Sequence, residues 1–151
     1  MYIGIGMLVF LGVIALWMIG TYNQLVMLRQ SVRESWSAIE TELRRRYDLI
    51  PNLVETVKGY AGHEKETLEA VIKARNSAAA VSGAPEAQAM ANNVLTGALT
   101  KLMALSEAYP ELKANENFNQ LQNTLNDTET RISQARRFYN ANVREMNTAV
   151  Q

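Results

Sequence analysis

The chain of 151 residues contains no cysteine, a single histidine, three prolines and eight glycines. Without cysteine it forms no disulfide and offers no thiolate as a metal ligand or nucleophile. Fifteen basic side chains are balanced by fifteen acidic ones, so the basic excess typical of nucleic-acid-binding proteins is missing and no nucleic-acid partner is expected. The low glycine and proline content argues against a loop-rich or all-β fold, and a helical protein is expected instead.

The N-terminal segment has the composition of a membrane anchor. Its first charged side chain is Arg29, and residues 3–20 form an unbroken run of apolar residues and glycine. A helix needs ~20 such residues to cross ~30 Å of hydrocarbon. Trp17 and Tyr22 lie near the end of the run, where aromatic rings favour the membrane interface. We therefore predict an anchor at residues 1–24 with Trp17 and Tyr22 at the interface.

A cleavable signal peptide is the competing interpretation of this segment. Such a peptide begins with basic residues and ends at a site of the A-x-A type. Here no Lys or Arg precedes the run, and the sequence from Gly20 to Asn23 is a poor cleavage site. The run is also apolar on every face, which disfavours a core helix. An uncleaved anchor is the preferred prediction.

The flanking charges predict the orientation of the anchor. Basic residues follow the apolar run, beginning with Arg29 and Arg33, and none precedes it. By the positive-inside rule, the C-terminal domain stays in the cytoplasm and the short N-terminus lies outside. Gly4, Gly12 and Gly20 are spaced by eight residues and form no GxxxG motif, so the span carries no specific dimerisation signal.

Beyond the anchor, apolar residues recur at helical spacings of three and four. The stripe consists of Leu25, Leu28, Val32, Trp36, Ile39, Leu43, Tyr47, Ile50, Val54, Val57 and Ala61. At this spacing, Trp36 is expected in the core. Pro51 interrupts the stripe, because proline lacks an amide hydrogen and disfavours helix at the residue before it. A turn at Pro51 gives helices of comparable length and is preferred, whereas the unbroken phase of the stripe favours a kinked continuous helix.

Further helices are expected at about residues 51–80, 85–108 and 115–151, separated by a loop at residues 81–85 and a turn at residues 109–111. Besides the stripe, the positions expected to face the core are Leu68, Ile72, Ala79, Ala91, Val94, Ala98, Leu102 and Leu105.

The last helix carries the most regular pattern. Two heptad positions are occupied by Phe118, Leu125, Ile132, Tyr139 and Met146, and by Leu121, Thr128, Ala135, Asn142 and Ala149. This is an a/d seam with polar interruptions. Helices of similar length joined by short connections form antiparallel bundles. The predicted fold is therefore all-α: an N-terminal single transmembrane helix followed by an antiparallel four-helix bundle with long helices, at residues 25–151.

Two segments carry a family resemblance. Residues 21–76 contain the string RRYDLIPNLVETVKGYA, and residues 99–147 contain the string TETRISQARRFYNANV. Both segments resemble the LemA family. The resemblance implies a bacterial protein of the cell (inner) membrane, with one N-terminal span, a short N-terminus outside and a helical-bundle domain. The family is associated with no established enzymatic activity, so the resemblance implies no mechanism.

The C-terminus departs from the family pattern. Family members usually continue past the position of Asn147 into a tail with proline and apolar residues, whereas this sequence stops at Gln151 in mid-heptad. Either the sequence is truncated or this member lacks the tail. A partner that binds such a tail cannot be predicted from these residues.

The sequence contains no pattern typical of a catalytic or metal site. A di-iron site in a helical bundle needs Glu-x-x-His from two helices, but His63 is the single histidine and Tyr60 lies three residues before it. Thr67 replaces the second histidine of H-E-x-x-H. G-x-S-x-G, P-loop and dinucleotide-binding motifs are missing too. We therefore expect no enzymatic activity, no cofactor, no bound metal and no small-molecule substrate.

The densest charge cluster is Arg44, Arg45 and Arg46. On a helix these side chains fan over ~200°, so they form no flat patch. An upright helix would also place them ~36 Å beyond the span, too far to attract lipid headgroups. They are the candidate partner-binding residues. The alternative is that they solvate the helix and pair with Asp48 or Glu55.

Two functions from different classes are compatible with these features. The first is a membrane-anchored scaffold or adaptor that contacts other membrane proteins and self-associates as a homo-oligomer. The anchor, the zero net charge and the heptad seam favour this function. The second is a membrane-surface remodelling or lipid-organising protein that assembles into large homo-oligomers. The lipid bilayer is a partner in both.

Overall fold

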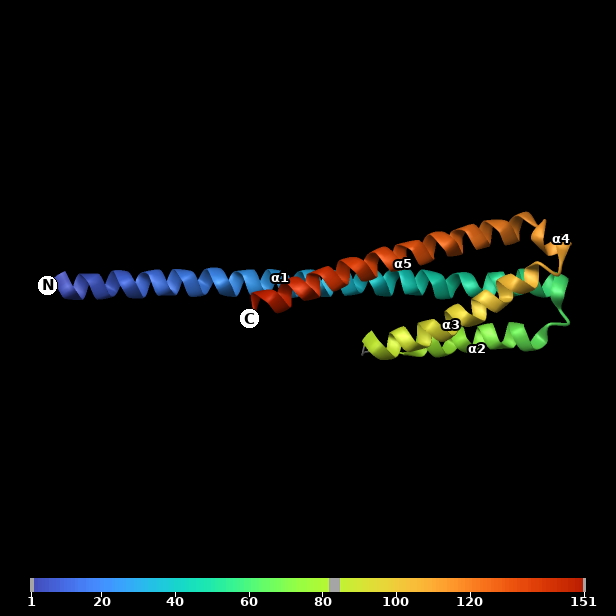
Figure 1. The fold of residues 1–151 in the computed structure, drawn as a ribbon, viewed down its shortest axis with the longest axis horizontal. Coiled ribbons are helices and arrows are strands. Elements are labelled where there is room, and N and C mark those ends of the chain that lie inside the picture. Colours follow the sequence, from blue (N-terminus) through green and yellow to red (C-terminus); the bar gives the residue numbers. More distant parts are fainter. Residues whose placement is uncertain (1, 82–84, 151) are drawn as a thin grey trace. The chain divides into compact units, whose positions relative to one another are not determined.

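The computed structural model describes residues 2–81 and 85–150, which form five helices and no strand. The helices in Figure 1 are α1 (Tyr2–Ala61), α2 (Lys65–Ala80), α3 (Pro85–Ser106), α4 (Pro110–Lys113) and α5 (Glu116–Ala149). The predicted all-α fold with a long N-terminal helix and a bundle is confirmed. The chain divides into two compact units. One is Glu40–Ile132, and the other joins Met1–Ile39 to Ser133–Gln151.

The unit Glu40–Ile132 contains a core to which all five helices contribute residues. Its largest buried apolar side chains are Leu43, Ile50, Leu53 and Val57 of α1, Val71 of α2, Leu95 and Leu102 of α3, Leu112 of α4 and Phe118 of α5. Asn115 caps α5, because its Oδ1 accepts a hydrogen bond from the Phe118 amide at 2.9 Å. Its Nδ2 donates to the Tyr60 hydroxyl at 2.9 Å, which joins the start of α5 to the end of α1. The two helices therefore run antiparallel in this unit.

Pro51 lies inside α1 without ending it, so the preferred prediction of a turn at this position is wrong. A proline in a helix leaves the carbonyl four residues earlier, here that of Tyr47, without its usual donor. Arg75 of α2 replaces this donor, since its Nε donates to the Tyr47 carbonyl oxygen at 3.1 Å. Ile50 and Leu53 on either side are buried. Core packing and a substitute hydrogen bond therefore offset the cost of the proline.

α1 ends at Ala61, ten positions after Pro51, and a turn over residues 62–64 follows it. A Cβ atom at position 62 would lie 3.0 Å from the Lys58 carbonyl oxygen, so Gly62 suits this close approach. The Glu64 amide donates to the Ala61 carbonyl oxygen at 3.0 Å and closes the turn. The chain then reverses, and α2 returns along the last part of α1 (Figure 1).

The face of α3 that meets the core differs from the predicted one. Val94 was expected inside but is 64% exposed, whereas Leu95 is buried; Leu102 is buried as predicted. The predicted face assumed that polar residues point outward, but Asn92 is buried among polar partners. Ala79 of α2 was also expected inside and is exposed.

The other unit contains the N-terminal part of α1. The large apolar side chains that the structure describes between residues 5 and 19 are exposed. Among the described residues, α1 is the one helix that is long and apolar enough to cross a membrane. This is a property of length and composition, and an N-terminal signal sequence meets the same criterion. Trp17 and Tyr22 are 70% and 69% exposed, and their place at a membrane interface stays a prediction.

Candidate functional site

The three consecutive arginines of α1 do not share a surface. Arg44 and Arg45 are exposed, whereas Arg46 is only 2% exposed. The Arg46 side chain lies in the core of the unit Glu40–Ile132, on the same side of α1 as Tyr47. Arg46 is therefore not available to a partner in this conformation. The prediction of partner binding is restricted to Arg44 and Arg45.

Polar groups from α3 and α5 surround the buried guanidinium. Arg46 Nε lies 2.8 Å from Glu129 Oε1 in a charge pair, and Nη2 donates to Thr96 Oγ1 at 2.8 Å. Nη1 makes a longer contact of 3.5 Å with Asn92 Oδ1, which also accepts a hydrogen bond from the Tyr47 hydroxyl at 3.1 Å. We call these five residues the Arg46 cluster. It links α1 to α3 and α5, and we expect it to hold these helices together.

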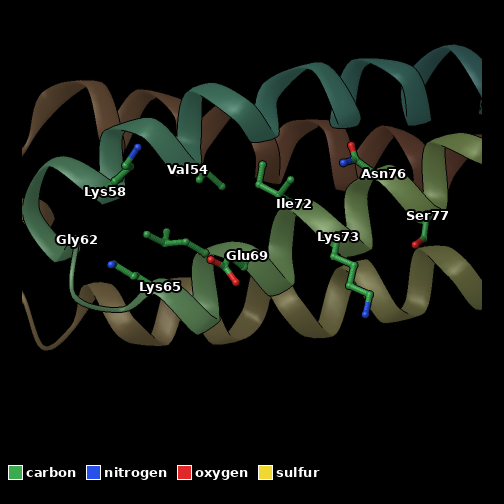
Figure 2. Close-up of a pocket in the computed structure, with 10 residues that line it drawn as sticks. Val54, Lys58, Gly62, Lys65, Glu69, Ile72, Lys73, Asn76 and Ser77 are labelled. Atoms are coloured by element: carbon green, nitrogen blue, oxygen red, sulfur yellow. The ribbon is translucent and has the colours of Figure 1, made fainter.

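A groove of about 720 Å³ lies between α1 and α2 in the same unit (Figure 2). Its floor consists of Val54 from α1 and of Leu68 and Ile72 from α2. Val54 and Leu68 are buried, while Ile72 is half-buried. Leu68 and Ile72 are one helical turn apart, so they form a continuous apolar row beside α1.

Lysines border the floor on both sides, and we call the whole site the lysine groove. Lys58 extends from α1, and Lys65 and Lys73 extend from α2 (Figure 2). Glu69 is the one acidic residue among the described lining residues, so three ammonium groups accompany one carboxylate. Lys65, Glu69 and Lys73 are four residues apart and form one row on α2 beside the apolar floor.

The lysine groove is an open trough and not an enclosed cavity. Along α2 its lining extends from Lys65 to Ser77, which is about 18 Å at ~1.5 Å per residue. This length corresponds to about three helical turns. The site therefore suits an elongated ligand with one apolar face, which is how an amphipathic helix binds to a groove.

The turn over residues 62–64 contains the single histidine, His63, which is exposed. In the part of the chain that the structure describes, no three His, Cys, Asp or Glu side chains are placed to hold a metal ion. Beside His63, the Tyr109 hydroxyl donates to Glu64 Oε1 at 3.1 Å. This contact joins the turn after α1 to the turn before α4.

The hydrogen bond to Glu64 raises the pKa of Tyr109 above its ordinary value of 10.0, with smaller contributions from desolvation and from the carboxylate charge. Because the pKa is higher in the folded state, the contact stabilises the fold below pH ~10 and is lost as the pH rises through the Tyr109 pKa. We expect an ultraviolet titration to show a late-ionising tyrosine that is missing in Tyr109→Phe and ionises earlier in Glu64→Gln. A tyrosine titration that Glu64→Gln leaves unchanged would contradict this assignment.

Trp36 lies in the unit formed by Met1–Ile39 and Ser133–Gln151, where it packs against Tyr139 of α5. The ring centroids are 5.3 Å apart and the planes are tilted by 57°. In the same unit, Asn142 Nδ2 donates to the Ser31 carbonyl oxygen at 3.2 Å, so α1 and α5 run antiparallel here as well. Trp36 is half-buried, not fully enclosed as a core residue would be.

Replacing Trp36 by alanine should lower the free energy of unfolding by about 1–3 kcal/mol, less than the ~3–5 kcal/mol of a fully buried tryptophan. Urea unfolding of the protein in detergent micelles, followed by circular dichroism, measures this loss. Phe138→Ala is the matched control, because Phe138 is on α5 and 62% exposed. Equal losses of unfolding free energy in Trp36→Ala and Phe138→Ala would mean that the contact between Trp36 and Tyr139 does not stabilise the fold.

Comparison with known proteins concerns the part of the chain beyond the apolar segment. The model of the LemA family matches residues 35–151. This range includes the Arg46 cluster and the lysine groove. No curated protein matches the chain.

Proposed function

Since the chain belongs to the LemA family, we propose that it is a membrane-anchored helical adaptor that acts through protein–protein contacts and catalyses no reaction. The N-terminal part of α1 crosses the inner membrane of a bacterial cell. The helical domain lies in the cytoplasm and the short N-terminus lies outside, as the charges after the apolar run favour. The lysine groove is the surface that binds another protein.

The lysine groove is the observation that supports this proposal. The groove stays open beside about three turns of α2, and its apolar floor reaches the surface at Ile72, which is half-buried. Apolar surface rimmed by polar side chains marks interaction sites on soluble domains. The anchor would tether the helical domain to the bilayer, where other membrane proteins lie.

Cross-linking in membranes of cells that produce the protein, followed by quantitative mass spectrometry, tests the proposal. Ile72→Glu places a charge on the groove floor and should remove the cross-linked partners. Ala70→Glu is the matched control, because Ala70 is exposed on α2 and is not among the groove residues. The proposal predicts partners that are captured by the wild type and by Ala70→Glu but lost with Ile72→Glu. Monomers alone, or partners that are insensitive to Ile72→Glu, would contradict it.

A second candidate function is the remodelling or organisation of a membrane surface by a large homo-oligomer. The outer face of α3 favours it, since Met90 and Val94 are one turn apart and are 72% and 64% exposed. Such a face suits contact between copies of the chain. This function predicts large assemblies of the purified protein on liposomes that Val94→Glu abolishes. Vesicles that keep their shape with the wild-type protein would exclude it.

A further inference from the structure

We propose that the lysine groove binds an amphipathic helix with acidic residues on its flanks, supplied by a different protein. This inference rests on the proposed adaptor function and names the chemistry of the partner. The partner helix would place apolar side chains at i, i+3 or i+4 and i+7 on the floor of Val54, Leu68 and Ile72. Its Asp or Glu side chains would lie against the lysines.

The dimensions of the site favour a helix over a small molecule. Small ligands bind in concave sites that enclose most of their surface, whereas the lysine groove is an open trough of about 18 Å along α2. A helix that lies parallel to α1 and α2 would pack its side chains between the two, as a further member of a bundle does. Such a helix of about three turns matches the length of the lined segment.

The charge of the rim favours acidic flanks. Lys58 stands on one wall, Lys65 and Lys73 stand on the other, and Glu69 is the one acidic lining residue that the structure describes. Lysine stems extend apolar cover beside the floor while their ammonium groups stay in water. A helix seated between these walls would therefore meet positive charge on both flanks, as charged positions beside a coiled-coil seam do.

The rim chemistry disfavours phosphate as the acidic group. Arginine binds phosphate with two parallel hydrogen bonds and is the usual choice for phosphopeptides, but the cations of this groove are all lysines. Single carboxylates pair with lysine as point charges and need no such geometry. Aspartate and glutamate are therefore the expected partners of Lys58, Lys65 and Lys73.

The exposed apolar face of this chain's own α3 does not fit the groove. That face contains Met90 and Val94, and its basic neighbour Lys101 would meet the lysine rim with like charge. Glu86, in the first turn of α3, is one acidic group and could pair with only one of the three groove lysines. A different protein therefore fits better than a second copy.

Binding of two labelled peptides to the full-length protein in phosphatidylcholine nanodiscs tests the inference. Both peptides are stapled helices of about four turns with leucines on one face. One has glutamates on its flanks and the other has lysines at the same positions. The acidic peptide should bind about tenfold more tightly than the basic one, and its affinity should fall as salt is added. Empty nanodiscs provide the background.

Variants connect the binding to the groove. Lys73→Glu should weaken binding of the acidic peptide about five- to tenfold and strengthen binding of the basic one, because it turns an attraction into a repulsion. Lys101→Glu, the matched control on α3, should change neither affinity. Ile72→Glu should abolish binding of both peptides, and circular dichroism shows whether each variant is folded.

Three results would overturn the inference. The first is equal affinity for the two peptides, and the second is an affinity that Lys73→Glu leaves unchanged. The third is displacement of the acidic peptide from the protein by phosphatidylglycerol vesicles, which would mean that lipid occupies the groove. If partners captured in cells depend on Ile72 while the peptides show no charge preference, the inference fails and the adaptor function stands. If the peptides bind as expected but no cellular partner depends on Ile72, the adaptor function fails instead.

Discussion

Replacing Arg46 by methionine should lower the free energy of unfolding by about 3 kcal/mol. Removal of one partner of a buried ion pair costs ~3–5 kcal/mol, because the other charge is left without compensation. The lower end applies here, since the Arg46 side chain is 2% exposed but that of Glu129 is 37% exposed and keeps part of its hydration. Urea unfolding of the full-length protein in detergent micelles gives the value.

Two further variants decide whether the effect comes from the Arg46 cluster. Arg45→Met removes the neighbouring exposed charge and should change stability by less than ~0.5 kcal/mol. The double variant Arg46→Met with Glu129→Leu should recover much of the loss, since a buried ion pair and an apolar pair of similar volume are often equally stable. A single-variant loss equal to that of Arg45→Met would show that the cluster does not hold the helices together.

Two arginines within the apolar run should release the protein from the membrane. Each arginine near the middle of a membrane-spanning helix opposes insertion by ~2.5–3.5 kcal/mol, so Leu11→Arg with Ile14→Arg opposes it by about 5–7 kcal/mol. Extraction of cell membranes with alkaline carbonate, followed by immunoblotting, measures the fraction that stays inserted. The wild type should stay in the pellet and the double variant should move to the supernatant.

The control for this experiment adds the same charge to the helical domain. Ala70→Arg with Ala104→Arg changes two exposed positions outside the apolar run. This variant should stay in the membrane pellet like the wild type. Retention of Leu11→Arg with Ile14→Arg in the pellet would mean that surfaces other than the apolar run hold the protein at the membrane.

The long first stripe is where sequence and structure agree best. From Ile39 to Ala61 every member of the stripe is buried, because apolar residues occupy each of its positions at helical spacing. The apolar spacing also continues in phase past Pro51, as a continuous helix requires. Comparable helix lengths favoured a turn there. The replacement donor, Arg75, could not be identified from the sequence because it lies on another helix and depends on the packed fold.

Buried polar residues account for most of the remaining errors. Arg46 and Asn92 belong to patterns that are typical of solvated faces, yet both lie in the core. Glu129 and Thr96 pair with the Arg46 guanidinium, and Asn92 accepts a hydrogen bond from Tyr47 and donates one to the Gln88 carbonyl oxygen. One signal was available in the sequence. Arg46 lies three residues after Leu43 and four before Ile50, so helical spacing places it beside the stripe and separates it from the exposed Arg44 and Arg45.

The lysine groove was not predicted. Leu68 and Ile72 were assigned to the core; Leu68 is buried as predicted, whereas Ile72 is half-buried. The groove depends on the spacing between α1 and α2. That spacing follows from the turn at Gly62, which the sequence analysis did not place. A helical pattern shows which face is apolar but not whether a neighbouring helix covers it.

The anchor is tested most directly by intact-mass spectrometry of the protein recovered from membrane and soluble fractions of cells that produce it. We predict that the membrane fraction contains the protein with residues 1–20 still attached and that the soluble fraction contains almost none. A soluble product that begins near Gly20 would contradict the prediction, because the apolar run would then be a cleaved signal and no helix would hold the domain at the bilayer.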